Sequence, residues 1–260
     1  MKRKQALLCT ALVVIIIGIT MFTGCDTITG SGETVTWDMD YTDFSRIDIS
    51  HAFNADITRS DTYLVRITID EALYEYLEIR VRGDTLYIGL KPNTLYVDVT
   101  REAIITLPDL RRLELSGAST AGVAGFSASH DMDFELSGAS RMELGDMEAD
   151  DTAMEASGAS KITGEMNMAD ARFGLSGAST IEMEGSADDI TVEASGASDV
   201  LLADLTIIDA DVHLSGASKA VIATDGRLDI DLSGASRLEY IGKPKLGEIN
   251  VSGGSTIKEK

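Results

Sequence analysis

The tetrapeptide Ser-Gly-Ala-Ser recurs seven times along this chain and is followed by one Ser-Gly-Gly-Ser. The eight copies begin at Ser116, Ser137, Ser157, Ser176, Ser195, Ser215, Ser233 and Ser252. Successive copies start 21, 20, 19, 19, 20, 18 and 19 residues apart. A period this short and regular is typical of a solenoid, in which each repeat buries its apolar face by stacking on its neighbours. We therefore predict an all-β fold, a β-solenoid with coils of about 19–20 residues.

Apolar residues flank every copy of the motif at fixed distances. Three residues before it stand Leu113, Phe134, Met154, Phe173, Val192, Val212, Ile230 and Ile249, and one residue before it Leu115, Leu136, Ala156, Leu175, Ala194, Leu214, Leu232 and Val251. Five residues after its first Ser stand Ala121, Met142, Ile162, Ile181, Val200, Ala220, Leu238 and Ile257. This alternation predicts a strand, a corner and a second strand with one face inward.

The motif itself is the predicted corner. Its glycine permits the backbone angles of a tight bend, and its alanine takes little room where coils stack about 4.8 Å apart. The corner glycines are Gly117, Gly138, Gly158, Gly177, Gly196, Gly216, Gly234 and Gly253. The serines can bond backbone groups that a bend leaves unpaired, but the sequence leaves open which of them face inward.

The repeat frame extends upstream of the obvious copies. Apolar residues at matching offsets surround Ser50, with His51 in place of the glycine, so residues 46–58 are predicted to form a degenerate first coil. Residues 71–80 hold at most a weak helical turn. We expect one solenoid domain over residues 37–258, with clear repeats over 113–257 and an atypical N-terminal part as its cap.

The N-terminus has the layout of an export signal. A basic Lys2-Arg3-Lys4 cluster precedes an apolar run from Ala6 to Phe22. Phe22-Thr23-Gly24-Cys25 resembles the lipobox of bacterial lipoproteins, which implies cleavage before Cys25 and acylation of its sulfur. The alternative is a plain transmembrane anchor, for which the run is short. We expect a lipoprotein signal peptide over residues 1–24 and a flexible Thr/Gly/Ser-rich tether over residues 25–36.

Charge narrows the possible partners. The chain carries 22 Lys or Arg and 43 Asp or Glu, a net charge of −21, and removal of the signal makes it −24. Nucleic acid needs a basic surface and is excluded as a partner. The second cysteine, Cys9, lies inside the signal, so the mature chain has no cysteine pair for a disulfide. The acidity suits cations, basic partner surfaces or simple solubility.

A family resemblance covers nearly the whole mature chain. Ile104-Ile105-Thr106-Leu107-Pro108-Asp109-Leu110, followed by Leu113-Glu114-Leu115-Ser116-Gly117-Ala118-Ser119, resembles the family called putative auto-transporter adhesin, head GIN domain. The stretches Phe44-Ser45-Arg46-Ile47 and Arg82-Gly83-Asp84-Thr85-Leu86 agree with it. The resemblance implies a right-handed, single-stranded parallel β-helix on exported, often lipid-anchored bacterial proteins. It implies no catalytic residue and no cofactor.

Two polar ladders are candidate binding features. Two residues before the motif stand the acidic residues Glu114, Glu135, Glu155, Glu193 and Asp231, interrupted by Gly174 and His213. Four residues after its first Ser stand Arg141, Lys161, Lys219 and Arg237 among polar neighbours. Stacked carboxylates repel one another. Either solvent and the second ladder offset them, or they bind a divalent cation as metal ligands. Because the sequence contains no calcium-binding Gly-Gly-x-Gly-x-Asp repeat, we favour a solvated face.

These features favour a non-enzymatic protein. Coils of nearly constant length leave no room for the long loops around a polysaccharide-cleaving site, and His51, His130 and His213 are scattered. We expect an exported protein bound to the lipid bilayer through Cys25, facing the periplasm or the cell exterior. Its function is then adhesion or binding of an envelope protein or glycan. The alternatives are a structural spacer and, more distantly, a polysaccharide-acting enzyme.

Overall fold

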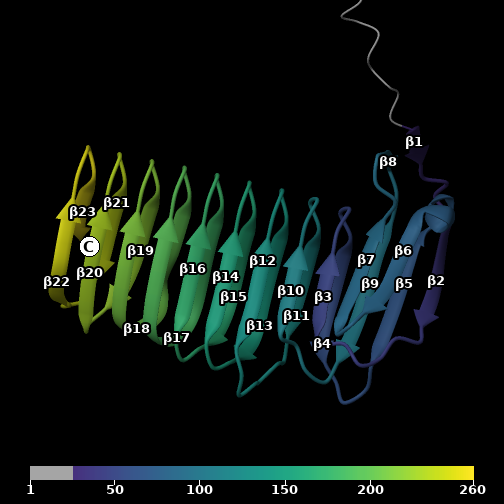
Figure 1. The fold of residues 1–260 in the computed structure, drawn as a ribbon, viewed down its shortest axis with the longest axis horizontal. Helices are drawn as coiled ribbons and strands as arrows, with labels where there is room; N and C mark the ends of the chain where they lie inside the picture. Colours follow the sequence, from purple (N-terminus) through teal and green to yellow (C-terminus); the bar gives the residue numbers. More distant parts are fainter. Residues whose placement is uncertain (1–25) are drawn as a thin grey trace, which may run out of the picture.

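The computed structural model describes residues 26–260 and confirms the predicted β-solenoid (Figure 1). Each coil consists of a strand that enters a Ser-Gly-Ala-Ser corner and a strand that leaves it. The entering strands stack in register as one face of the solenoid and the leaving strands as the other, and we call these the entry face and the exit face. Neighbouring coils pair in parallel, as Glu135 with Glu155 on the entry face and Arg141 with Lys161 on the exit face.

The entry face contains β3 (Arg46–Ile49), β10 (Arg112–Leu115), β12 (Met132–Leu136), β14 (Thr152–Ala156), β16 (Ala171–Leu175), β20 (Arg227–Leu232) and β22 (Lys245–Val251). The exit face contains β4 (Asn54–Arg59), β11 (Thr120–Ala124), β13 (Arg141–Glu148), β15 (Lys161–Asn167), β19 (Lys219–Thr224), β21 (Arg237–Ile241) and β23 (Thr256–Glu259). Two long strands, β17 (Thr180–Ala194) and β18 (Asp199–Leu214), begin on the exit face, bend and continue on the entry face.

The corner is built as its residue types predict. All eight motif glycines have φ between 62° and 77°, the left-handed region that glycine adopts most easily. The structure also shows which serine faces inward. The second serine of each Ser-Gly-Ala-Ser copy is buried, and its hydroxyl donates to the carbonyl of the first, as Ser198 does to Ser195 at 2.9 Å. The first serine is partly exposed.

The predicted core positions are buried in every repeat except the last. Phe134, Phe173 and Val212 illustrate the column three residues before the motif, and burial of such a side chain contributes about 1.5–3 kcal/mol. In the last repeat the same positions are open, with Ile249 44% and Val251 47% exposed. The reason is that no further coil stacks on β22 and β23 within the described residues.

At the N-terminal end, the coils do not stack in the order in which they occur in the sequence. The predicted degenerate coil is confirmed, because β3 and β4 pair in register with β10 and β11. It is not the outermost coil, however. Strands β7 (Thr85–Leu90) and β9 (Arg101–Leu107) pair with the other edges of β3 and β4, so a later segment covers an earlier one. The chain therefore inserts its first coil between two coils that follow it in sequence.

Antiparallel strands close this end. β6 (Leu77–Arg82) pairs with β7, β5 (Leu64–Asp70) with β9, and β2 (Thr34–Met39) with β5. The weak helical turn is the short 3-10 helix η1 (Glu71–Tyr76). From Asp26 onward, no helix is long and apolar enough to cross a bilayer.

The structure corrects the expected flexible tether. Residues 26–36 do not form a loose linker, because β1 (Asp26–Thr29) pairs with β8 (Thr94–Val97) and Thr34–Thr36 belong to β2. The fold therefore begins before the predicted boundary at residue 37. The predicted signal peptide (1–24) and Cys25 lie outside the described residues.

Candidate functional site

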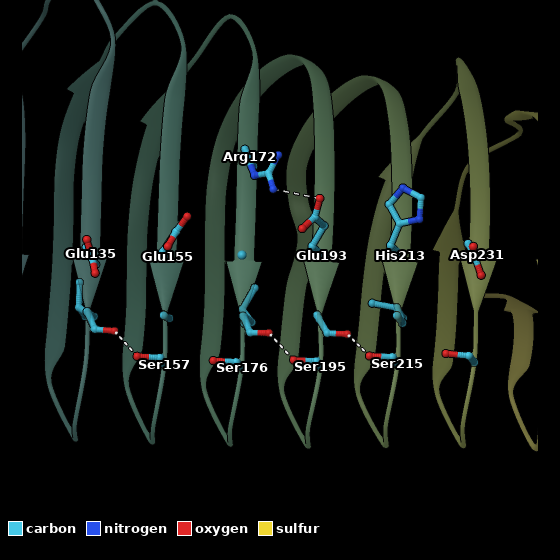
Figure 2. A pocket seen from close by; sticks show the side chains of 17 residues that line it. Glu135, Glu155, Ser157, Arg172, Ser176, Glu193, Ser195, His213, Ser215 and Asp231 are labelled. Atoms are coloured by element: carbon cyan, nitrogen blue, oxygen red, sulfur yellow. Dashed lines mark hydrogen bonds and ion pairs between the residues drawn. The ribbon is translucent and has the colours of Figure 1, made fainter.

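A shallow groove of about 520 Å³ crosses the entry face beside the corners (Figure 2). The groove is lined by residues of β12, β14, β16 and β20 and of the entry-face parts of β17 and β18. Polar side chains at two offsets line it: the acidic ladder, and the first serines of the motifs. The lining polar residues are Glu135, Glu155, Ser157, Arg172, Ser176, Glu193, Ser195, His213, Ser215, Asp231 and Ser233.

Four of the five predicted ladder acids lie in this groove. Glu135 pairs in register with Glu155, and Glu193 pairs with His213, which in turn pairs with Asp231. Gly174 stands between Glu155 and Glu193, so the row of side chains is interrupted there. Of the four acids, Glu155, Glu193 and Asp231 are exposed to solvent.

The fifth ladder acid, Glu114, lies outside the groove toward the N-terminal end. It pairs in register with Glu135 on one side and with Asp48 on the other. Burial, together with the carboxylates of Asp48 and Glu135, raises the pKa of Glu114. Burial also raises the pKa of Asp48, although the guanidinium groups of Arg80 and Arg112 oppose that shift. The ladder therefore extends one coil further than the sequence prediction.

Two of the four groove acids, Glu135 and Glu193, have counterions on their own face. Arg112 bonds to the carboxylate of Glu135, and Arg172 donates to Glu193 at 3.0 Å, as Figure 2 shows. The predicted second ladder stands after the corner and therefore on the exit face, where Lys161 pairs with Glu182 at 3.0 Å. The expectation that this ladder offsets the first is corrected. Within residues 26–260, Glu155 and Asp231 form no ion pair.

The groove serines are arranged for structure rather than nucleophilic attack. Ser195 donates to the carbonyl of Leu175 at 3.3 Å, and Ser157 makes the equivalent bond to Leu136. His213 faces Asp211 at 3.1 Å instead of a serine. A nucleophilic serine needs a base within hydrogen-bond reach, and the described groove residues supply none.

A serine and a histidine do meet at the first corner, away from the groove. Ser50 Oγ lies 2.8 Å from His51 Nδ1, and the backbone N–H of Leu90 approaches the same nitrogen at 3.3 Å. Burial lowers the pKa of His51. His51 has φ 64°, in the place of the motif glycine. The described residues place no carboxylate in hydrogen-bond contact with its other ring nitrogen, so the pair lacks the group that orients a catalytic histidine.

A row of aspartates that was not predicted from the sequence lies at the bend opposite the corners. Asp131, Asp151, Asp170, Asp189 and Asp209 each stand six residues before a motif, and this constant offset could have revealed them. The pairing of Asp189 with Asp209 places them in adjacent coils. Partial desolvation and the charges of Asp170, Asp209 and Asp188 raise the pKa of Asp189. Despite these rows, no group of three or more His, Cys, Asp or Glu among residues 26–260 is arranged to hold a metal ion.

Comparisons with known proteins agree with the fold. A protein from Parabacteroides distasonis described as a putative lipid binding protein is 19% identical, with a TM-score of 0.83, over 90% of this chain and 100% of its own. A putative adhesin from Parabacteroides merdae is 18% identical, with a TM-score of 0.82, over 90% and 99%. A putative adhesin from Bacteroides fragilis is 16% identical, with a TM-score of 0.71, over 90% and 100%.

No curated protein matches this chain. The model of one family covers most of it, from residue 43 to residue 244, and this span includes the groove, the degenerate coil and all but the last corner. The chain therefore belongs to the family described as putative auto-transporter adhesin, head GIN domain.

Proposed function

We propose that this protein is an exported, lipid-anchored module of the bacterial cell envelope that binds an envelope partner without catalysis. The groove on the entry face is its contact surface. The observation that carries the proposal is the stack of in-register carboxylates in that groove, of which Glu155 and Asp231 have no ion-pair partner among the described residues. The adhesin names of the family and of its solved relatives support the same function.

The chemistry of the groove defines the kind of partner. Carboxylates repeat across the coils beside serine hydroxyls, and one arginine and one histidine stand among them. Such a surface fits an extended polypeptide or glycan that presents cationic and hydroxyl groups, because complementary charge favours encounter and fixes register. Nucleic acid does not fit this surface, since its phosphates would face the carboxylates.

Cross-linking on intact cells tests the proposal. The protein is captured after gentle cross-linking and compared with the double variant Glu155→Lys and Glu193→Lys. The matched control is Glu143→Lys with Asp204→Lys, which makes the same charge change at exposed sites on the exit face. We expect a specific partner that the groove variant loses and the control keeps. Equal capture by both variants would place binding elsewhere, and capture of nothing would favour a structural spacer.

The lipid anchor has its own test. Mass spectrometry of the protein isolated from membranes should show a chain that begins at an acylated Cys25. Cys25→Ala should release or misprocess it. An uncleaved, unmodified N-terminus would exclude lipoprotein processing.

A further inference from the structure

The fold begins directly beside the expected lipid attachment site. Asp26, the residue after Cys25, already pairs with Thr94, and the pairing of β1 with β8 continues to Thr29 and Val97. The next residues are fixed as well, because Gly30 donates to the carbonyl of Val97 at 3.0 Å. Consecutive Cα atoms are 3.8 Å apart. A lipid on Cys25 would therefore hold β1 at the membrane surface, with no linker between them.

The two strands nearest this site have an uncharged outer face. Ile28 and Tyr96 are paired with each other and pack against the core. Side chains alternate along a strand, so Thr27, Thr29, Leu95 and Val97 occupy the opposite face. Leu95 is 53% exposed there. None of these four residues carries a charge, and two of them, Leu95 and Val97, are aliphatic.

The short helix η1 contacts β1 and places aromatic side chains beside these two strands. Tyr76 of η1 packs edge-on against Tyr96 with ring centroids 5.8 Å apart. Tyr74, 64% exposed, lies against Trp37 at 5.4 Å. Tyrosine and tryptophan suit the boundary between lipid and water, because their rings are apolar at one end and polar at the other. Figure 1 shows β1 and β8 projecting from a corner of the N-terminal end, far from the open last coil.

We propose that the outer face of β1 and β8 rests on the bilayer surface and fixes the orientation of the solenoid on the membrane. This inference rests on the proposed lipid anchor and adds a second, protein-mediated contact to it. The lipid on Cys25 holds the protein at the membrane, and an apolar protein contact adds to that anchor. Asp26 directly precedes Thr27 and Asp98 directly follows Val97, so a zwitterionic surface suits this face better than an anionic one.

Hydrogen exchange on a tethered protein tests this contact. The chain from Cys25 onward, which contains the whole described fold, is coupled through its single thiol to a maleimide lipid in phosphatidylcholine vesicles. The same chain blocked with N-ethylmaleimide serves as the reference. We expect slower amide exchange in peptides covering residues 26–29 and 94–97 on vesicles, and unchanged exchange in β22 at the far end. Equal exchange at 26–29 and 94–97 in both samples would overturn the proposal.

Two variants with matched exposure separate a specific contact from crowding at the membrane. Leu95→Glu should abolish the protection, whereas Ile208→Glu, at a residue 55% exposed in β18, should leave it intact. If Leu95→Glu lowers the melting temperature, Thr27→Glu on the paired strand β1 provides a second test of the same contact. Protection that survives both the Leu95→Glu and the Thr27→Glu change would overturn the proposal.

Changing the lipid composition of the vesicles tests whether the contact prefers a zwitterionic surface. Adding phosphatidylglycerol to the vesicles should weaken the protection, since it brings anionic headgroups close to Asp26 and Asp98. A gain in protection would mean an electrostatic contact made by another surface, and would also overturn the proposal. Because the coupling is chemical, these results do not depend on acylation in the cell. Mass spectrometry of Cys25 tests acylation separately, so the failure of one idea is distinguishable from failure of the other.

Discussion

The carboxylate of Asp70 accepts hydrogen bonds from the backbone N–H of Ser31 at 3.0 Å and from its hydroxyl at 2.9 Å. The same carboxylate accepts from the N–H groups of Gly32 and Ala72, each at 3.0 Å. It therefore ties the segment between β1 and β2 to the start of η1. These bonds, with that of the Ser31 N–H the largest effect, lower the pKa of Asp70 to about 2.

This network predicts a specific loss of stability in acid. The folded-state pKa of Asp70 lies below its ordinary value of about 3.9, so its contribution is complete above about pH 4 and is lost as the pH falls toward 2. Asp70→Asn should lower the free energy of unfolding at pH 7, and the difference from the parent should shrink over that acid range. Denaturant unfolding at several pH values measures it. A difference independent of pH would contradict the assignment, and Asp204→Asn is the exposed control.

The corner glycine predicts a large effect of a side chain at that position. A Cβ on Gly196 would overlap the carbonyl oxygen of Gly177 in the coil below, and its φ of 77° strains any branched residue. Gly196→Val should cost a few kcal/mol of stability. Asp199→Ser, on the exit-face ladder three residues later, should change it by no more than about 0.5 kcal/mol. Equal melting temperatures would show that the corner tolerates a side chain.

The buried serine of the corner should matter more than the exposed one. Ser198 is fully buried and donates to the carbonyl of Ser195, so Ser198→Ala should cost about 1 kcal/mol by leaving that contact unmade. Ser195→Ala removes only a longer, partly exposed bond to Leu175 and should cost less. Thermal unfolding of the two variants gives the comparison. The reverse order would mean that the first serine holds the stack.

The sequence predicts the regular part of this fold well because each coil repeats one local rule. Motif spacing and two-residue alternation locate the corners and the core columns, such as that of Phe134 and Phe173. The N-terminal end depends instead on pairings between distant segments. Nothing local in Thr85–Leu90 indicates that it stacks outside Arg46–Ile49. The Thr/Gly/Ser composition of residues 26–36 predicts a flexible tether. The segment is ordered instead, because it pairs with residues far away in the sequence, including Thr94–Val97 and Asp70.

The site was predicted only in part for a similar reason. The offset of the ladder acids is visible in the sequence, and four of the five line the groove. Their counterions do not form a visible ladder, because the position four residues before the motif is arginine only at Arg112 and Arg172 and changes type in the other repeats. Which face a ladder occupies depends on the corner between the two ladders. A basic residue after the motif lies on the exit face. It therefore cannot neutralise an acidic residue before the motif, which lies on the entry face.

The charge of the repeats predicts a response to salt. Residues 113–255 carry 26 Asp or Glu against 8 Lys or Arg, and stacking brings many of the acids into adjacent coils. Self-repulsion should lower stability at low ionic strength, so added monovalent salt should raise the melting temperature. At matched ionic strength, calcium and magnesium should act alike. Much greater stabilisation by calcium would instead indicate a specific site for that ion.

The aspartate row at the bend predicts a stabilising mutation. Asp189 stands between Asp170 and Asp209, and the raised pKa of its carboxyl means that folding disfavours its charged form. The sign is opposite to that of Asp70, since lowering the pH through the folded-state pKa of Asp189 relieves a destabilising charge. Asp189→Asn should therefore raise the melting temperature at pH 7 in low salt, and the gain should fade as salt is added. Glu143→Gln, exposed on the exit face between Gly122 and Thr163, is the control for loss of one negative charge. If the two variants respond equally, the effect comes from net charge alone, and the row has no local repulsion of its own.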